Sequence, residues 1–465
     1  MPDGREGLWR TLGEAVKGSS IDYTTAPLGR AIVMLAVPMV MEMAMESVFV
    51  LADVFWVAHL GADAVATVGL TESMLVLIYT LAMGLSIGAT AIVARRIGEG
   101  DAEGASRAAV QAIAIGLGVS IVIAVGGAWF AEDLLRVMGA SPEVIATGSG
   151  FTRVMLGGNV TIVLLFLINA VFRGAGDAAI AMRVLWVGNA INIVLGPCFI
   201  FGLGPFPELG VTGAAVATNI GRGTAVVLQL LTLMRWGGRV NVARRHLALD
   251  LPTMGSMLRL SGSGTLQILI GTASYVALVR IVSIFGSAAL AGYTIGMRLV
   301  IFALLPSFGI SNAAATMVGQ NLGAGHPDRA EKAVWTAAFY NMLFLGAVGL
   351  VFLVAARPIV SAFTTDAAVA GYAVTCLRIV SGGFLFYAYG MVLTQSFNGA
   401  GDTWTPTVIN LVVFWVLELP LAWFLSHGGG LAAGGVFVAL AVAYSLLAVV
   451  SAAVFRRGSW KRARV

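Results

Sequence analysis

Apolar stretches long enough to cross a lipid bilayer recur along this chain, and short polar links separate them. A helix needs about 20 apolar residues to cross the hydrocarbon core. The pattern predicts twelve such helices, at residues 31–57, 67–94, 106–130, 144–171, 180–203, 211–235, 255–283, 289–319, 330–355, 368–396, 404–426 and 431–455. The predicted fold class is therefore an all-α integral membrane protein with 12 transmembrane helices.

The polar links give the predicted organisation. The longest runs from Trp236 to Pro252, at the middle of the chain, and is read as the connector between two halves. We predict a cytoplasmic N-terminal segment (1–27), a six-helix bundle (28–235), a cytoplasmic connector (236–252), a second six-helix bundle (253–455) and a basic cytoplasmic tail (456–465). Helical spacing of Leu8, Trp9, Leu12 and Val16 favours an amphipathic helix in the first segment.

Composition agrees with lipid as the solvent. The chain is 58% hydrophobic and 11% charged, with a mean hydropathy of +0.91, whereas soluble domains carry about 25% charged residues. Its net charge of +5 is distributed unevenly. With both termini placed in the cytoplasm, 21 of the 28 basic residues fall in cytoplasmic segments and two in outer loops. This is the bias expected of an inner-membrane, multi-pass protein, and it needs no nucleic-acid partner.

The two halves are related by a repeat with a constant offset of 225 residues. Gly61–Ala66 corresponds to Gly286–Ala291, and Phe172–Asp177 to Phe397–Asp402. Because six helices separate equivalent points, the halves have the same orientation in the membrane. Transporters with such parallel repeats bind substrate between the halves, near the middle of the bilayer.

Three carboxylates lie in the first predicted helix. Glu42, Glu46 and Asp53 fall within about 40° of one another on a helical wheel. A charge at the membrane centre costs about 2.5–3.5 kcal/mol or more, so this face is expected to line a water-filled interior. It is a candidate proton or cation site; alternatively, the acids only pair with arginines such as Arg153 or Arg222.

The sequence does not decide the roles of the other polar residues in the predicted helices. Those in helices four to six could ligate a cation or bond helix to helix: Asn169, Asn189, Asn192, Thr218 and Asn219. In the second half, Leu278 occupies the position that matches Asp53, and Glu418 is either a second acidic site or part of a structural ion pair. Candidate residues of the substrate cleft are Met45, Phe49, Tyr275 and Tyr387.

Taken together, these motifs resemble the multidrug and toxic compound extrusion (MATE) transporters of prokaryotes. The resemblance covers about Leu28 to Phe455 and depends on the order and duplication of short motifs. They are Pro38-Met-Val-Met-Glu42, Leu51-Ala-Asp-Val-Phe-Trp-Val-Ala-His-Leu-Gly61, a Gly-x-Gly turn after the second helix of each half, Phe-x-Gly-Ala-Gly-Asp before each fifth helix, and Gly213-Ala-Ala-Val-Ala-Thr218.

The resemblance implies two six-helix bundles that form a V around a central cleft. It implies a transporter, not an enzyme, which exports small organic and often cationic compounds as H⁺ or Na⁺ flows inward. No cofactor is expected beyond the coupling ion, and a monomer is expected to function. A flippase for lipids or lipid-linked sugars, which resembles this fold, is the alternative, and it would need a cleft lined by several arginines.

The resemblance also implies particular site residues. Asp53 matches the first-helix aspartate of the family's N-terminal polar cluster, and Glu46 lies where relatives often have a polar residue. Asn169, Asn192 and Thr218 match other members of that cluster. Gly196 replaces a carboxylate common among relatives, which favours protons over Na⁺ at Asp53. Predicted helices seven and ten contain no acids, so coupling is expected in the N-terminal half.

Overall fold

The computed structural model describes residues 4–18, 21–235, 238–463 and 465. Trp236, at the start of the predicted connector, and Arg464, in the predicted tail, lie outside these residues. The described chain is helical with no strand, which confirms the predicted fold class. The predicted N-terminal helix is present as α1 (Gly4–Lys17).

The first half contains eight helices. They are α2 (Leu28–Ala58), α3 (Ala62–Gly98), α4 (Ala102–Trp129), the short α5 (Ala131–Val137), α6 (Pro142–Gly157), α7 (Asn159–Ala175), α8 (Ala178–Phe201) and α9 (Val211–Arg235). The connector contains one turn of 3₁₀ helix, η1 (Arg244–His246).

The second half repeats this order with one irregular span. Its elements are α10 (Leu251–Ser283), α11 (Ser287–Gly323), α12 (Pro327–Ser361), α13 (Ala367–Gly382), α14 (Phe384–Ala400), α15 (Trp404–Asn410), η2 (Leu411–Glu418), α16 (Leu419–Trp423), η3 (Phe424–Gly428), α17 (Ala433–Arg456) and η4 (Ser459–Arg462). The elements η2 and η3 are π-helical, and they interrupt the eleventh predicted span.

The helices agree with the predicted spans within a few residues, and the main difference lies in the tenth span. The described chain has 11 helices long and apolar enough to cross a membrane, or 12 if one bent pair counts as a single span. That pair is α13 and α14, which meet at 60°. Gly383 lies at this bend, and the equivalent Gly158 separates α6 from α7. The tenth span is thus bent at Gly383, whereas α6 and α7 together form the single fourth span, Pro142–Ala175, with only a short interruption at Gly158.

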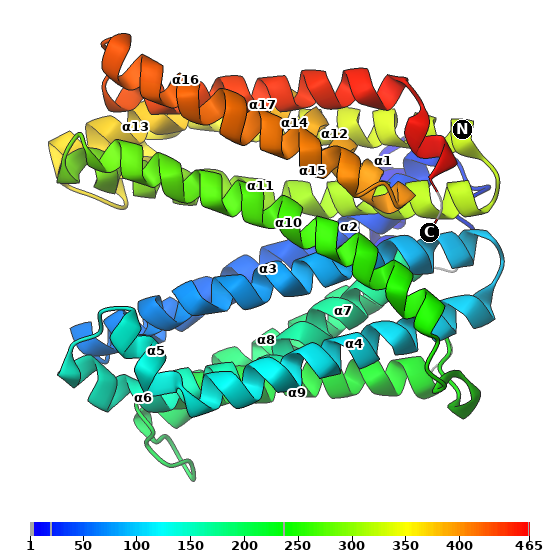
Figure 1. Cartoon of the computed structure of the whole chain (residues 1–465), viewed down its shortest axis with the longest axis horizontal. Helices are drawn as coiled ribbons and strands as arrows, with labels where there is room; N and C mark the ends of the chain where they lie inside the picture. The colour runs from blue at the N-terminus through cyan, green and yellow to red at the C-terminus, as the bar shows by residue number, and fades with distance from the viewer. Residues whose placement is uncertain (1–3, 19–20, 236–237, 464) are drawn as a thin grey trace.

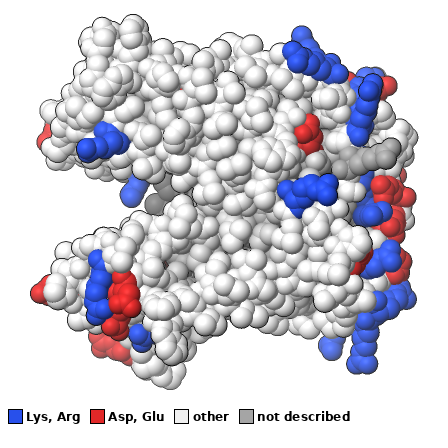
Figure 2. Space-filling model, viewed as in Figure 1, with Lys and Arg blue, Asp and Glu red and all other residues white. Residues whose placement is uncertain are grey.

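The long helices form two groups that converge toward one end of the molecule and separate toward the other (Figure 1). Both ends of the described chain lie at the convergent end, which we call the termini side. A deep notch opens on the opposite side, and Lys and Arg gather on the termini side, with a mostly uncharged band between the two ends (Figure 2). The shape is the V that the sequence resemblance implied.

The two halves are joined by a symmetric exchange of contacts. α2 packs against α11, the second helix of the other half, and α10 packs in the same way against α3. Glycines permit the close approach, because a Cβ at Gly84 would lie 2.0 Å from Thr265 Oγ1. The equivalent Cβ at Gly309 would lie 2.7 Å from the backbone nitrogen of Val40. Both pairs are related by the 225-residue repeat, so the duplication is visible in the packing as well as in the sequence.

Candidate functional site

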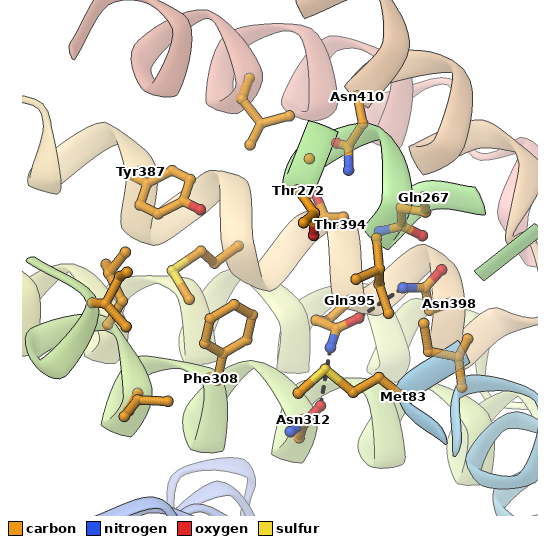
Figure 3. A pocket seen from close by; sticks show the side chains of 18 of the residues that line it. Met83, Gln267, Thr272, Phe308, Asn312, Tyr387, Thr394, Gln395, Asn398 and Asn410 are labelled. Carbon is orange, nitrogen blue, oxygen red and sulfur yellow. Dashed lines mark hydrogen bonds between the residues drawn. The ribbon is translucent and has the colours of Figure 1, made fainter. Parts of the chain in front are cut away.

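A cavity of about 560 Å³ lies between the two halves. Its wall is largely apolar, and most of it comes from the second half, through α10, α11, α14, η2 and α17. Amide side chains form a short polar chain within it: Asn398 Nδ2 donates to Gln395 Oε1 at 2.7 Å, and Gln395 Nε2 donates to Asn312 Oδ1 at 3.0 Å (Figure 3). The cavity has the apolar lining and few polar groups that are typical of small-molecule sites.

Glu42 is held inside the first half by an ion pair. Arg173 Nη1 donates to its Oε1 at 2.9 Å, and Asn169 Nδ2 donates to the same oxygen at 3.0 Å. Gln229 Nε2 in turn donates to Asn169 Oδ1. The Glu42 side chain is 2% exposed and that of Arg173 is 11% exposed. This network ties α2 to α7 and α9, so Glu42 and Asn169 have an evident structural role.

Arg173 corrects one sequence assignment. Arg173 is one of the 21 basic residues that the sequence predicts in cytoplasmic segments. The structure places it in the last turn of α7, buried against Glu42 and lining the cavity. The predicted alternative, that the acids pair with buried arginines, is therefore correct for Glu42, but with a partner that the sequence did not single out.

Glu46 lies one helical turn from Glu42 and has weaker partners. Asn189 Nδ2 donates to its Oε2 at 3.3 Å, and Arg222 Nη2 lies 3.8 Å from its Oε1. Arg222 is buried, and its guanidinium also lies over the rings of Phe49 and Tyr79, at 5.3 and 5.7 Å from their centroids. Glu46 is therefore neutralised in part by Arg222, although its side chain remains 28% exposed.

Asp53 differs from the two glutamates. Within the described residues its carboxylate makes no hydrogen bond or ion pair, and the charges that act on it are those of Glu72 and Arg222. Glu72, on α3, is exposed, and the positive charge of Arg298, on α11 of the second half, acts on it electrostatically. Sequence reasoning missed Glu72, although an acid inside the second predicted span was a sufficient signal.

The remaining predicted polar residues divide into separate groups. Asn192 Nδ2 donates to Thr218 Oγ1 at 2.9 Å, which joins α8 to α9. Asn219 Nδ2 donates to the carbonyl of Val154 and so joins α9 to α6. No described hydrogen bond connects Asp53 to any of these residues, so the predicted cluster consists of several helix-to-helix bonds with Asp53 apart from them.

The four candidate cleft residues divide by half. Tyr275 and Tyr387 line the cavity. Phe49 is buried under Arg222 inside the first half, and Met45 is not part of the cavity wall. Met43 lines the cavity instead, because residues 43 and 45 point about 200° apart on the helix. Glu418, which the sequence left undecided, also lines the cavity.

None of the five arginines predicted inside the membrane lines the cavity: Arg153, Arg222, Arg280, Arg298 and Arg378. Arg153 and Arg378 are exposed and donate to backbone carbonyls, of Ala128 and Leu353. Their equivalent roles match their equivalent places in the repeat. The cationic cleft that a pyrophosphate-lipid flippase would need is therefore not present in this wall.

No group of three or more His, Cys, Asp and Glu side chains within the described ranges could hold a metal ion. Asn192 Nδ2 donates to Thr218 Oγ1, which in turn donates to the carbonyl of Ala214, and no contact within the described residues joins either side chain to Asp53. Gly196 contributes no side chain at the position where relatives commonly have a carboxylate, as the family resemblance implies.

Both halves of the chain are similar in sequence to known membrane transporters. The family model MatE matches residues 38–198 and 265–424, one stretch in each half. The probable multidrug resistance protein YoeA of Bacillus subtilis is 26% identical over 422 residues, which cover 90% of this chain and 91% of that protein. The probable multidrug resistance protein NorM of Thermotoga maritima is 24% identical, with 94% of each chain covered.

Solved structures agree with these relatives. The outward-facing conformation of a multidrug resistance MATE family transporter of the MOP superfamily superposes with a TM-score of 0.87 at 26% identity. The match covers 97% of this chain and 98% of that one. The similarity thus extends over both halves and over nearly the full length.

Proposed function

The chain belongs to the MatE family of multidrug efflux transporters, and from this premise we propose that it is a secondary antiporter that exports small organic compounds in exchange for protons. One observation carries the choice of coupling residue. Of the three acids on the polar face of α2, Glu42 and Glu46 have arginine partners and Asp53 has none within the described residues. Coupling is assigned to the N-terminal half on this basis.

The difference in partners supports a difference in role. Removing a proton from a carboxyl group or adding one to it changes the local charge by one unit. At Glu42 that change would break a buried ion pair, which is strongly destabilising. At Asp53 it breaks no hydrogen bond of the described structure, so this residue can exchange a proton at the lowest structural cost.

Protons are favoured over Na⁺ by the ligands available. Na⁺ needs several oxygens around one point, whereas residue 196 is a glycine and gives Asp53 no second carboxylate, and the described hydrogen bonds of Asn192 and Thr218 do not reach Asp53. Glu72, the nearest acid that acts on Asp53, lies on α3 and is exposed. A carboxyl group that binds a proton needs none of these ligands.

We propose that transport follows alternating access between the two halves. The termini side carries the excess of basic residues and is assigned to the cytoplasm of an inner-membrane protein. The notch then faces outward. Protonation of Asp53 from the outside would change the packing of α2, which contacts both halves and lacks one backbone N–H donor at Pro38. Movement of α2 would change the cavity and release its substrate, and the proton would leave to the cytoplasm after the halves reclose. A monomer contains every residue of this scheme.

Efflux from inverted membrane vesicles tests the proposal. A pH gradient should drive export of a fluorescent organic cation by the natural sequence, and Asp53→Asn should reduce it to the rate seen without a gradient. Asp63→Asn is the matched control, because Asp63 is exposed in the first turn of α3. Unaltered pH-driven efflux in Asp53→Asn would contradict the assignment of Asp53 as the coupling residue. Efflux driven only by a Na⁺ gradient would show that the coupling ion is Na⁺ and not a proton.

A further inference from the structure

The two halves share a backbone break near their notch-side ends. α4 ends at Phe130 (φ −98°, ψ 17°), and α12 contains the same conformation at the equivalent Ala355 (φ −100°, ψ 16°). In each half an arginine of the following long helix donates from Nε to the carbonyl two residues before the break, Arg153 at 3.3 Å and Arg378 at 3.1 Å. Because the 225-residue repeat relates both pairs of positions, the two sites have one backbone frame.

The side chains on this frame differ in charge. In the first half Arg153 Nη2 lies 3.3 Å from Oε1 of Glu132, which follows the acceptor carbonyl by one helical turn. The repeat places Arg357 at the position of Glu132. Since the break and the bond to the carbonyl are the same, the second half brings two guanidinium groups, of Arg357 and Arg378, to the place where the first half has an ion pair.

No acid within the described part of the chain forms an ion pair with Arg357 or Arg378, and both side chains are exposed. Asp366 lies in the loop between α12 and α13, but it caps α13 by accepting from the backbone N–H groups of Ala368 and Val369. Figure 2 shows red and blue side chains together at the tip of the first half, whereas the tip of the second half presents blue ones with red only at its far edge. The positive charge of this site is therefore uncompensated.

The site lies at the depth of lipid headgroups. Lys332, in the first turns of α12, is followed by an uncharged stretch, and Leu353, whose carbonyl accepts from Arg378, is 21 residues further on. This separation corresponds to about 32 Å of helix, close to the roughly 30 Å of a hydrocarbon core. Exposed apolar side chains precede the site on α12, namely Leu350, Val351 and Val354. The two guanidinium groups thus border an apolar surface at the edge of the hydrocarbon.

Unpaired basic residues are unusual on this side of a membrane protein, because basic residues collect in the cytoplasmic segments. The predicted outer loops contain two, Arg136 and Arg357. Arg136 Nη1 lies 2.7 Å from Oδ1 of Asp133, whereas Arg357 has no such partner among the described residues. Arg378 uses only its Nε–H group on the carbonyl, which leaves the other N–H groups of its guanidinium free to bind an anion.

We propose that Arg357 and Arg378 bind the phosphate of an anionic phospholipid in the leaflet on the notch side. Guanidinium groups donate to phosphate oxygens in a bidentate manner, and a phosphate between two of them offsets their mutual repulsion. The acyl chains would lie along the exposed apolar face of α12. A lipid is the occupant rather than a soluble phosphate, because the donors adjoin an apolar surface at headgroup depth. Neither arginine lines the cavity, so the site is separate from the proposed antiport.

Native mass spectrometry of the delipidated, full-length protein tests the proposal by counting bound lipids. The protein is titrated in detergent with phosphatidylglycerol, or with phosphatidylcholine that has the same acyl chains and no net charge. We expect Arg357→Glu, which restores the charges of the first half, to retain about one phosphatidylglycerol fewer per protein than the natural sequence. The same number of phosphatidylcholine molecules should bind to both proteins. Arg357→Gln should show the same loss, and size-exclusion chromatography verifies the folding of each variant.

The first half provides the reciprocal experiment. Glu132→Arg should create a second pair of unneutralised guanidinium groups and add about one phosphatidylglycerol per protein. Arg136→Gln is the matched control, because Arg136 is an exposed arginine of the same side that already has an acidic partner. It should retain as many phosphatidylglycerol molecules as the natural sequence.

Three results would overturn the proposal. An unchanged phosphatidylglycerol count in both Arg357 variants would refute the site, and an equal loss of phosphatidylcholine in them would show that lipid charge is not recognised. Displacement of the lipid by glycerol phosphate would identify a site for soluble phosphates instead. Because none of these measurements uses an ion gradient, their outcome is independent of the proposed function.

Discussion

Substitution of either partner in the Glu42–Arg173 pair should be strongly destabilising. The two side chains are 2% and 11% exposed, and Arg173 Nη1 lies 2.9 Å from Glu42 Oε1. Truncation of one partner of a buried pair leaves the other charge without compensation, at a cost of about 3–5 kcal/mol. We therefore expect Arg173→Met to lower the free energy of unfolding by about this amount, and Glu42→Gln to lower it somewhat less because its amide oxygen still accepts hydrogen bonds.

The double variant tests the electrostatic argument. Glu42→Gln with Arg173→Met removes both charges and retains an acceptor for Asn169 Nδ2, which donates to Glu42 Oε1. Replacement of a buried ion pair by uncharged groups of similar volume is often close to neutral. We therefore expect the double variant to be more stable than Arg173→Met alone, although it carries one substitution more.

Reversible unfolding in mixed micelles, followed by helical circular dichroism, measures these free energies. The four proteins form a double-mutant cycle, in which the interaction energy is the departure from additivity. If the double variant lost the sum of the two single losses, the charges would not compensate each other, and the network would be explained by packing alone. Single variants as stable as the natural sequence would refute the burial argument itself.

Two further predictions concern the packing between the halves and the connector. Gly84→Val should prevent assembly of the halves, because a Cβ at this position would lie 2.0 Å from Thr265 Oγ1. Gly69→Val should assemble normally, because a Cβ there has open space around it, and size-exclusion chromatography of both variants checks this. The pKa of Glu103 is lowered, chiefly by its hydrogen bond with His246 of the connector. This carboxylate therefore stabilises the fold fully at pH values above its unfolded pKa of about 4.3. The stabilisation is lost as the pH falls through the lower pKa of the folded state. Glu103→Gln should therefore lower the melting temperature at pH 7 and make no difference at about pH 3, and a difference retained at pH 3 would contradict this.

The sequence predicted the helices well because lipid imposes a simple rule. Each span must satisfy its backbone internally and present apolar side chains, and both requirements are visible locally. The short interruption at Gly158 and the bend at Gly383 were not predicted, because a glycine within an apolar stretch is as compatible with a straight helix as with a bent one. The repeat offered the missing signal, since both glycines occupy equivalent positions.

The candidate site was less predictable than the fold. Helical spacing placed Glu42, Glu46 and Asp53 on one face, but it could not say which arginine approaches which acid. That depends on the rotation and depth of α7 and α9, which tertiary packing determines. Arg173 comes directly after the apolar stretch of the fourth span, so its position in the sequence predicts a loop residue, yet the structure buries it. The position of Glu418 in the cavity wall was equally hidden, because the cavity is formed by helices far apart in sequence.

The exchange of contacts between halves has a consequence for biosynthesis. α2 is among the first segments to leave the ribosome, but one of its two main partners, α11, ends only at Gly323. At roughly 5–20 residues per second, the intervening stretch of about 265 residues takes roughly 13 to 53 s to synthesise. During this interval the face of α2 that will meet α11 must be covered by lipid or by the insertion machinery. The first half is therefore expected to mature only after much of the second has been inserted, and a chain truncated at the connector should be recognised by quality-control proteases.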